Sequence, residues 1–116
     1  MKELIGDDCF RMLDEENFIV FFFTASWCNP CQKIYPLIEE LFETYNPSII
    51  QIAKIDIDNE DNEELCTTCK ITSVPTFMLF KDRTLLNQTS GGNIQKVQEM
   101  IESTIIKTMD EEKDDK

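Results

Sequence analysis

Histidine is absent from this 116-residue chain, and basic residues are scarce. Without an imidazole, the protein can perform no Cys/His nucleophilic catalysis and can build no His-containing metal site. Only 11 Lys and Arg accompany 23 Asp and Glu, so the formal net charge is −12. A surface this acidic repels nucleic acid and anionic membranes. We therefore expect protein or small-molecule partners, with no nucleic acid and no membrane among them.

Long apolar runs are also missing. Residues 1–10 contain acidic side chains and no apolar stretch typical of a secretory signal, and the apolar segment 18–23 is far too short to cross a bilayer. A cytoplasmic, reducing setting is therefore the expectation. In that setting the five cysteines of the chain favour catalysis or metal binding over a framework of structural disulfides.

The most informative segment that is present is Trp27-Cys28-Asn29-Pro30-Cys31. In a helix, residues i and i+3 lie side by side with Cβ atoms about 5–6 Å apart, so a small adjustment brings Cys28 and Cys31 within disulfide distance. Pro30 fits the first helical turn, where its missing N–H costs no hydrogen bond. The positive end of the helix dipole favours the thiolate of Cys28, which is the form that attacks disulfides.

The rest of the sequence predicts alternating strands and helices. Segments 18–23 and 48–57 are apolar or Ile-rich and predict buried strands. The apolar spacing after the cysteine pair predicts an amphipathic helix that faces the sheet through Ile34, Leu37, Ile38, Leu41 and Tyr45 and is kinked near Pro36. The other expected elements are a short strand over 2–5, a helix capped by Asp7 or Asp8, a helix from Asn59 to about Lys70, strands over 76–81 and 84–89 joined by Asp82-Arg83, and a last helix capped by Asn93.

These elements predict one α/β domain over residues 1–109. Two strand–helix–strand transitions followed by a hairpin and a closing helix indicate a central mixed β-sheet of four to five strands flanked by about four helices. Residues 110–116 contain no apolar side chain, which predicts a disordered acidic tail.

Several of these segments together resemble the thioredoxin family. They are the Trp27–Cys31 motif after a buried strand, Pro36, Lys54-Ile55-Asp56-Ile57-Asp58, Val74-Pro75-Thr76 and Gly91-Gly92. A lone Cys-x-x-Cys is a weak signal, because zinc sites and haem attachment sites share it. The order and spacing of the whole set match the family over roughly residues 2–105 and imply a thioredoxin fold.

The resemblance implies a role for each matching position. Cys28 would be the attacking thiol and Cys31 the resolving thiol, and Pro75 would be a cis-proline opposite the pair. Val74 and Thr76 would offer backbone groups to an extended substrate strand. The apolar rim of that docking groove would consist of Trp27, Val74, Gly91 and Gly92. Family members carry no cofactor, reduce disulfide-containing proteins and are re-reduced by an NADPH-dependent flavoenzyme, thioredoxin reductase.

Two positions depart from the family pattern. Phe22 occupies the place of a buried aspartate that accepts the proton of the resolving thiol, so Cys31 is expected to deprotonate less readily and turnover to be slower. Lys54, which in the family lies near that aspartate, loses this partner. Asn29, next to Pro30 between the two cysteines, replaces a glycine and can alter solvation of the thiolate.

Cys66 and Cys69 form a second Cys-x-x-Cys. Four cysteines in two pairs would satisfy the ligand count of a zinc site, but the 34 residues from Gln32 to Leu65 exceed the roughly 15–20 that separate such pairs in zinc ribbons. We expect no metal site. Cys66 and Cys69 are interpreted as small helix residues that pack inward, with an accessory disulfide as the alternative, and Cys9 as a structural residue.

The leading interpretation is a thiol–disulfide oxidoreductase that reduces protein disulfides through a mixed disulfide at Cys28. The alternative is an interaction or redox-sensing module of the same fold with weak or no reductase activity, for example a subunit of a larger assembly such as axonemal dynein. Phe22 keeps that alternative open.

Overall fold

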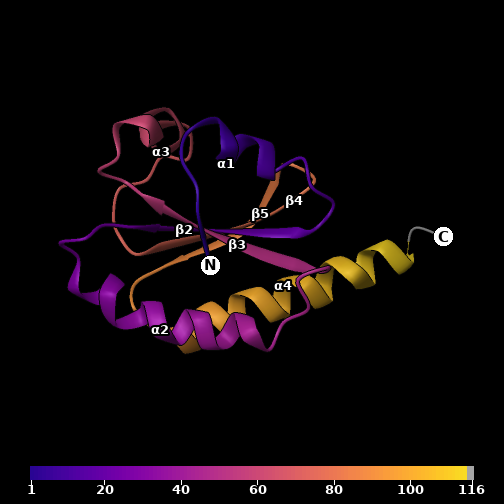
Figure 1. Ribbon diagram of the computed structural model, residues 1–116. Helices are drawn as coiled ribbons and strands as arrows, with labels where there is room; N and C mark the ends of the chain where they lie inside the picture. The colour runs from indigo at the N-terminus through magenta and orange to yellow at the C-terminus, as the bar shows by residue number, and fades with distance from the viewer. Residues whose placement is uncertain (115–116) are drawn as a thin grey trace.

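The computed structural model describes the backbone of residues 1–114 and the side chains of residues 1–111. A five-stranded sheet forms the middle layer, with α1 and α3 on one side and α2 and α4 on the other (Figure 1). The elements in chain order are β1 (Lys2–Glu3), α1 (Asp7–Met12), β2 (Phe18–Thr24), α2 (Asn29–Glu43), β3 (Ile50–Asp56), the 3-10 helix η1 (Glu60–Asn62), α3 (Glu63–Thr68), β4 (Thr76–Lys81), β5 (Thr84–Ser90) and α4 (Ile94–Asp114).

The sheet is mixed, as the sequence predicts. Its strand order is β1-β3-β2-β4-β5; β1 and β2 run parallel to β3, whereas β4 is antiparallel to both β2 and β5. All seven residues of β2 are buried, which confirms the strand predicted from an apolar run without alternation. The carboxyl end of β2 therefore leads the chain from the centre of the sheet directly to Cys28.

Each face of the sheet carries its own apolar core. Strand periodicity sends alternate side chains of β2 to opposite faces. The core under α2 and α4 includes Phe22, Ile34, Ile38, Phe77, Val97 and Ile101. The core under α1 and α3 includes Cys9, Phe21, Phe23, Leu65 and Met78. Burying each of these larger side chains contributes about 1.5–3 kcal/mol relative to exposure, so both layers of helices are held to the sheet.

Two predicted caps and the hairpin are confirmed. The Asn93 side chain accepts hydrogen bonds from the N–H groups of Gln95 and Lys96 at the start of α4. Asn59 accepts one from Asp61 N–H, but the helix that it opens begins as the 3-10 turn η1 before α3. In the hairpin, Asp82 and Arg83 adopt φ of 51° and 64°, the left-handed pair that a two-residue β-hairpin needs.

Other expectations were wrong in detail. The N-cap of α1 is Gly6, not Asp7 or Asp8; its N–H is bonded to Asn62 instead. Leu37 is 42% exposed, because it lies about 100° around the helix from Ile38 and falls at the edge of the apolar stripe.

Two outcomes concern the ends of the remaining helices. Helix α2 continues through Pro36 and ends at Glu43. Tyr45, predicted to lie on this helix, follows its end but still packs against the core. Helix α4 reaches Asp114 and so includes residues 110–114 of the predicted acidic tail, and residues 115–116 lie outside the described residues. Within residues 1–114, no helix has the length and apolar character needed to span a membrane.

A buried asparagine joins the segment before α1 to the start of α3. The Asn62 side chain is fully buried; its Oδ1 accepts from Gly6 N–H at 2.8 Å and its Nδ2 donates to the Asp56 carbonyl at 2.9 Å. Asn62 therefore satisfies two backbone groups, one of them 56 residues away along the chain, a role that no local sequence pattern indicates.

We expect Asn62→Ala to lower the free energy of unfolding by about 2–4 kcal/mol, because it leaves the Gly6 donor and the Asp56 acceptor without partners in a buried site. Urea denaturation followed by circular dichroism measures the change. Asn17→Ala is the matched control, since Asn17 makes one exposed bond to Pro47. Equal stability of the Asn62 variant and the control would contradict the assigned role.

Candidate redox site

Cys28 and Cys31 form a disulfide at the start of α2, with Cα atoms 5.2 Å apart. Cys28 is the N-cap residue of this helix and has extended backbone angles, whereas Cys31 lies within the first turn. Both are buried, yet neighbouring Trp27, Asn29 and Pro30 are exposed. The pair thus lies just beneath the surface, where the buried strand β2 gives way to the helix.

The backbone around the pair favours a thiolate on Cys28. Its Sγ accepts a hydrogen bond from Cys31 N–H at 3.2 Å, one of the donors that a helix start leaves without partners. Pro30 falls in the same turn, as predicted. Below the pair, the Ala25 carbonyl accepts from Cys28 N–H at 3.2 Å and from the Gln32 side chain at 3.1 Å. The Cys31 N–H and the helix dipole both stabilise negative charge on Cys28 once the disulfide is reduced.

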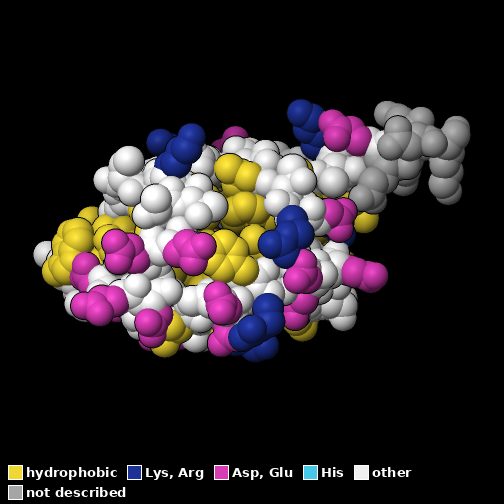
Figure 2. All heavy atoms as spheres, turned by 90° about the horizontal axis from the view of Figure 1, so that it is seen from above, with side chains coloured by type: hydrophobic (Ala, Val, Ile, Leu, Met, Phe, Trp, Pro, Cys, Tyr) yellow, Lys and Arg dark blue, Asp and Glu magenta, His cyan; other side chains and the backbone are white. Residues whose placement is uncertain are grey.

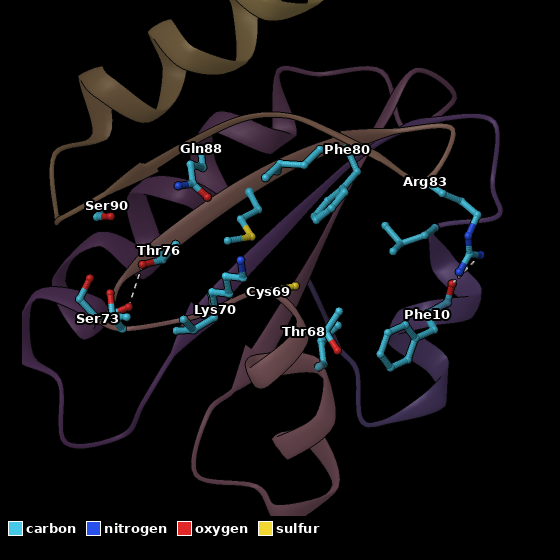
Figure 3. A pocket seen from close by; sticks show the side chains of 16 residues that line it. Phe10, Thr68, Cys69, Lys70, Ser73, Thr76, Phe80, Arg83, Gln88 and Ser90 are labelled. Carbon is cyan, nitrogen blue, oxygen red and sulfur yellow. Dashed lines mark hydrogen bonds between the residues drawn. The ribbon is translucent and has the colours of Figure 1, made fainter.

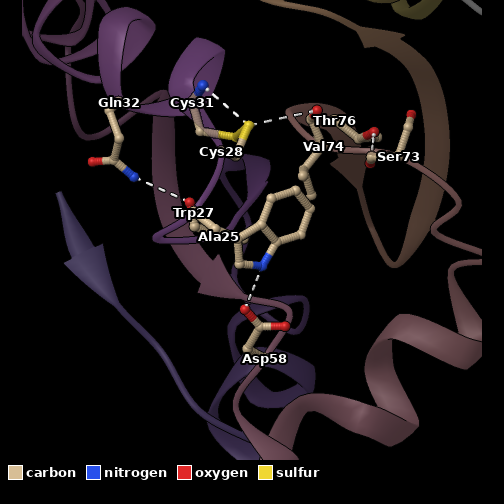
Figure 4. Close-up of a disulfide and its surroundings, with 9 residues drawn as sticks. All are labelled: Ala25, Trp27, Cys28, Cys31, Gln32, Asp58, Ser73, Val74 and Thr76. Carbon is tan, nitrogen blue, oxygen red and sulfur yellow. Dashed lines mark hydrogen bonds between the residues drawn. A yellow bond between two sulfur atoms is a disulfide. The ribbon is translucent and has the colours of Figure 1, made fainter.

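The Val74–Pro75 loop faces the disulfide (Figure 4). Its Val74–Pro75 bond is cis, as the family resemblance implies, and the Val74 carbonyl oxygen lies 3.7 Å from Cys28 Sγ. The loop is tied on both sides: the Pro75 carbonyl accepts from Gly91 N–H at 2.9 Å, and Thr76 Oγ1 donates to the Ser73 carbonyl at 2.7 Å. Cys28 and Val74, 46 residues apart in the chain, are therefore held in contact at the disulfide.

The predicted rim residues surround this contact. Trp27 is 65% exposed, and its Nε1–H donates to Asp58 Oδ2 at 2.7 Å. A Cβ on Gly92 would come within 3.3 Å of Pro30 Cβ, and Gly91 has φ of +97°, so both positions suit glycine. The anchoring role of Asp58 was not predicted, although the residue directly follows the strand predicted over residues 48–57.

Phe22 is fully buried and stacks on Phe77 with centroids 4.8 Å apart. The position that the family resemblance associates with a carboxylate is thus part of an aromatic core. Lys54, its neighbour in the β2–β3 register, has other partners: its Nζ lies 4.8 Å from the Tyr35 ring centroid and 3.6 Å from a Glu3 carboxylate oxygen. Lys54 therefore has an aromatic and an acidic partner although Phe22 supplies no carboxylate.

The other three cysteines are free and lie on the opposite side of the sheet from α2. Cys9 is buried, whereas Cys66 and Cys69 are half-buried and pack on the same core, as the sequence interpretation expects. Burial raises the pKa of each thiol, that of Cys9 to about 11. In residues 1–114 no group of three or more Cys, Asp or Glu is arranged to hold a metal ion.

A dithiol–disulfide pair at a helix start, facing a cis-proline loop, defines a thiol–disulfide oxidoreductase site. Comparison with known proteins agrees. The family model for thioredoxin matches residues 7–107. Thioredoxin from Gallus gallus is 31% identical over 90 residues, covering 78% of this chain and 82% of that protein. Thioredoxin from Ictalurus punctatus is 34% identical over 86 residues, covering 74% of this chain and 78% of that protein.

Solved structures give the same result. Spinach chloroplast thioredoxin f superposes with a TM-score of 0.80 at 27% identity, covering 89% of this chain and 91% of that one. Fasciola hepatica thioredoxin superposes with a TM-score of 0.75 at 33% identity, covering 85% and 94%. The chain belongs to the thioredoxin family and has the thioredoxin fold.

The buried thiol of Cys9 predicts a loss of stability at alkaline pH. Because the pKa of Cys9 is about 11 in the folded protein against 9.0 for an unperturbed thiol, the unfolded chain releases this proton first. The contribution is complete below pH 9 and is lost as the pH rises through 11. Between pH 8 and pH 10, wild type should lose about 1 kcal/mol more unfolding free energy than Cys9→Ala.

Urea denaturation of both proteins in the same reducing buffer at the two pH values measures this difference. The two proteins differ in no other titratable group, so the difference between them reports Cys9. Equal losses would contradict the assignment.

Proposed function

We propose that this protein reduces disulfides in other proteins through a mixed disulfide at Cys28. The observation that carries the proposal is the contact of the Cys28–Cys31 pair with the cis-Pro75 loop, with the Val74 carbonyl 3.7 Å from Cys28 Sγ. In this arrangement the attacking sulfur and the backbone that would align an extended substrate strand lie side by side. The relatives and structural neighbours named thioredoxin support the same chemistry.

The reaction transfers two electrons from the protein dithiol to the substrate. The Cys28 thiolate attacks one substrate sulfur; the substrate S–S bond breaks and the other substrate sulfur leaves as a thiolate, which takes a proton from solvent. Cys31 then loses its proton to solvent, and its thiolate attacks Cys28 Sγ; the leaving substrate sulfur takes up a proton in turn. The mixed disulfide breaks, the second substrate thiol leaves, and the Cys28–Cys31 disulfide remains.

A reductase must restore the dithiol. One structural neighbour is a thioredoxin f2 in complex with ferredoxin:thioredoxin reductase, with a TM-score of 0.80 and 27% identity, which supports a reductase partner. For this chain we infer an NADPH-dependent flavoenzyme of the thioredoxin reductase type. A reducing compartment, the cytoplasm, is the proposed setting, since it suits a chain with three free thiols.

Replacement of each cysteine separates their roles. In an NADPH-coupled assay with thioredoxin reductase and a protein disulfide, Cys28→Ser should lower turnover at least about 1000-fold, because the nucleophile is lost. Cys31→Ser should instead accumulate a covalent complex with substrate that is visible on a non-reducing gel and is released by dithiothreitol. Cys66→Ser serves as the control and should retain wild-type turnover.

Absence of turnover by wild type, with the reductase active on another thioredoxin, would defeat the proposed function. The interaction or redox-sensing module would then be the better account of the chain.

Phe22 should slow the resolving step. In Phe22→Asp, a carboxylate would stand beside Lys54 in the β2–β3 register and could accept the Cys31 proton, so release of the mixed disulfide should accelerate up to about 100-fold. Stopped-flow fluorescence of Trp27, the only tryptophan, measures this step. Phe22→Leu, which removes the ring without supplying a base, is the control; a resolving rate for Phe22→Asp no higher than that of wild type would refute the penalty.

A further inference from the structure

A second surface feature begins where the redox site ends. A groove with a volume of about 550 Å³ runs along β4 between α1, α3 and β5. We call it the β4 groove, and its floor includes Thr76, Met78 and Phe80, with Leu13, Cys69 and Leu85 at its sides. Helices α1 and α3 have six residues each, so they cover only part of this face. The groove is the part of β4 and β5 that they leave open.

The β4 groove is continuous with the redox site. Ser73 and Thr76, which flank Val74 and Pro75, line its near end, and Figure 3 shows them there together with Ser90, while Phe10 and Arg83 lie at the far end. Thr76 to Phe80 spans about 13 Å of strand at roughly 3.3 Å per residue. That length accommodates about four residues of an extended chain leaving the cis-proline loop.

The charge of the groove differs from that of the rest of the molecule. In a chain with 23 acidic residues, none lines the β4 groove, whereas Lys70 and Arg83 do. Figure 2, which looks down on the α1 and α3 side, shows hydrophobic side chains exposed in the middle of this face, with most of the acidic side chains on one side of them.

The two basic side chains differ in availability. Arg83 is paired with Asp14, but Lys70 makes no salt bridge to any described residue and extends over the groove toward β4 (Figure 3). On the other side of Lys70, the neighbouring hollow is lined by Asp58, Glu60 and Glu63. A negative charge on a bound chain is therefore favoured in the β4 groove and repelled beside it.

We propose that the β4 groove binds an extended segment of the disulfide substrate, with apolar side chains on its floor and an acidic side chain against Lys70. This inference rests on the proposed reductase function and names the substrate class that the site prefers: proteins whose reducible cysteine is followed or preceded by a short apolar and acidic stretch. The Leu85 side chain is 44% exposed in the free protein and becomes covered when the substrate segment binds.

The test uses peptides whose single cysteine is joined by a disulfide to 2-mercaptoethanol. One peptide carries a four-residue flank of alternating leucine and glutamate, a second replaces glutamate by lysine, and a third has a glycine–serine flank. Each is made with the flank on either side of the cysteine. The pre-reduced protein reacts with each peptide in excess, Trp27 fluorescence reports the second-order rate, and the rate is divided by that of the same protein on bis(2-hydroxyethyl) disulfide.

For wild type, the leucine–glutamate peptide should react about 10-fold faster than the glycine–serine peptide when the flank is on one particular side of the cysteine. This gain corresponds to burying about one apolar side chain. Leu85→Ser should remove most of this gain. Lys70→Glu should reverse the preference for glutamate over lysine by about 3- to 5-fold, the range of a surface ion pair. Leu86→Ser and Lys96→Glu are matched controls on residues outside the groove and should behave as wild type.

Equal normalised rates on all peptides would overturn the proposal while leaving the reductase function intact. No reaction of wild type even with bis(2-hydroxyethyl) disulfide would instead defeat the reductase function itself. Sedimentation of wild type and Leu85→Ser tests another occupant: a wild-type dimer that this variant dissociates would show that a second copy of the chain fills the groove, and would also overturn the proposal.

Discussion

The burial of strand β2 is the constraint on which the rest of the structure depends. Because all seven of its residues are inaccessible, both faces of the sheet must be covered, and α2 and α4 on one side and α1 and α3 on the other supply that cover. The same burial fixes the end of β2 in space. Cys28 follows four residues later and caps α2. The buried end of β2 and the start of α2 therefore fix the position of its sulfur.

Phe22 and the Cys28–Cys31 pair meet different physical demands. Phe22 stacks on Phe77 and contributes apolar burial, which stabilises the sheet, whereas a carboxylate at the same place would cost free energy unless it were paired. Lys54 contacts the Tyr35 ring and pairs with Glu3, so its charge has partners although Phe22 provides none. Phe22 therefore contributes to the packing of the sheet and supplies no proton acceptor at its position.

Electrostatics divides the surface around the site into two regions. Asp58 bonds to Trp27 and lines a hollow together with Glu60 and Glu63, whereas the β4 groove, on the other side of Lys70, is lined by no acidic residue. Since exposed charges are screened within about 10 Å at ordinary salt, this local contrast bears on a docked segment more than the net charge of −12 does. The net charge acts on the approach of a charged partner, whereas the charges that line the groove act on the segment bound in it.

The sequence by itself determined the mixed sheet, the buried central strand and the reactive pair, because these depend on local apolar periodicity and on the i, i+3 spacing of Cys28 and Cys31. The spacing of Pro75 and Gly91-Gly92 placed the docking loop through resemblance to the family. Local patterns were weaker where another segment competes for a group. Gly6, not the predicted aspartates, is the N-cap of α1, and its N–H bonds to Asn62, 56 residues away.

Only the tertiary structure decided which long-range partners meet. The contact of Cys28 with Val74, the anchoring of Trp27 by Asp58 and the new partners of Lys54 each join segments that are far apart in the chain. The β4 groove exists only because two short helices leave β4 and β5 partly open. Such features depend on how completed elements pack, and no local run of residues encodes them.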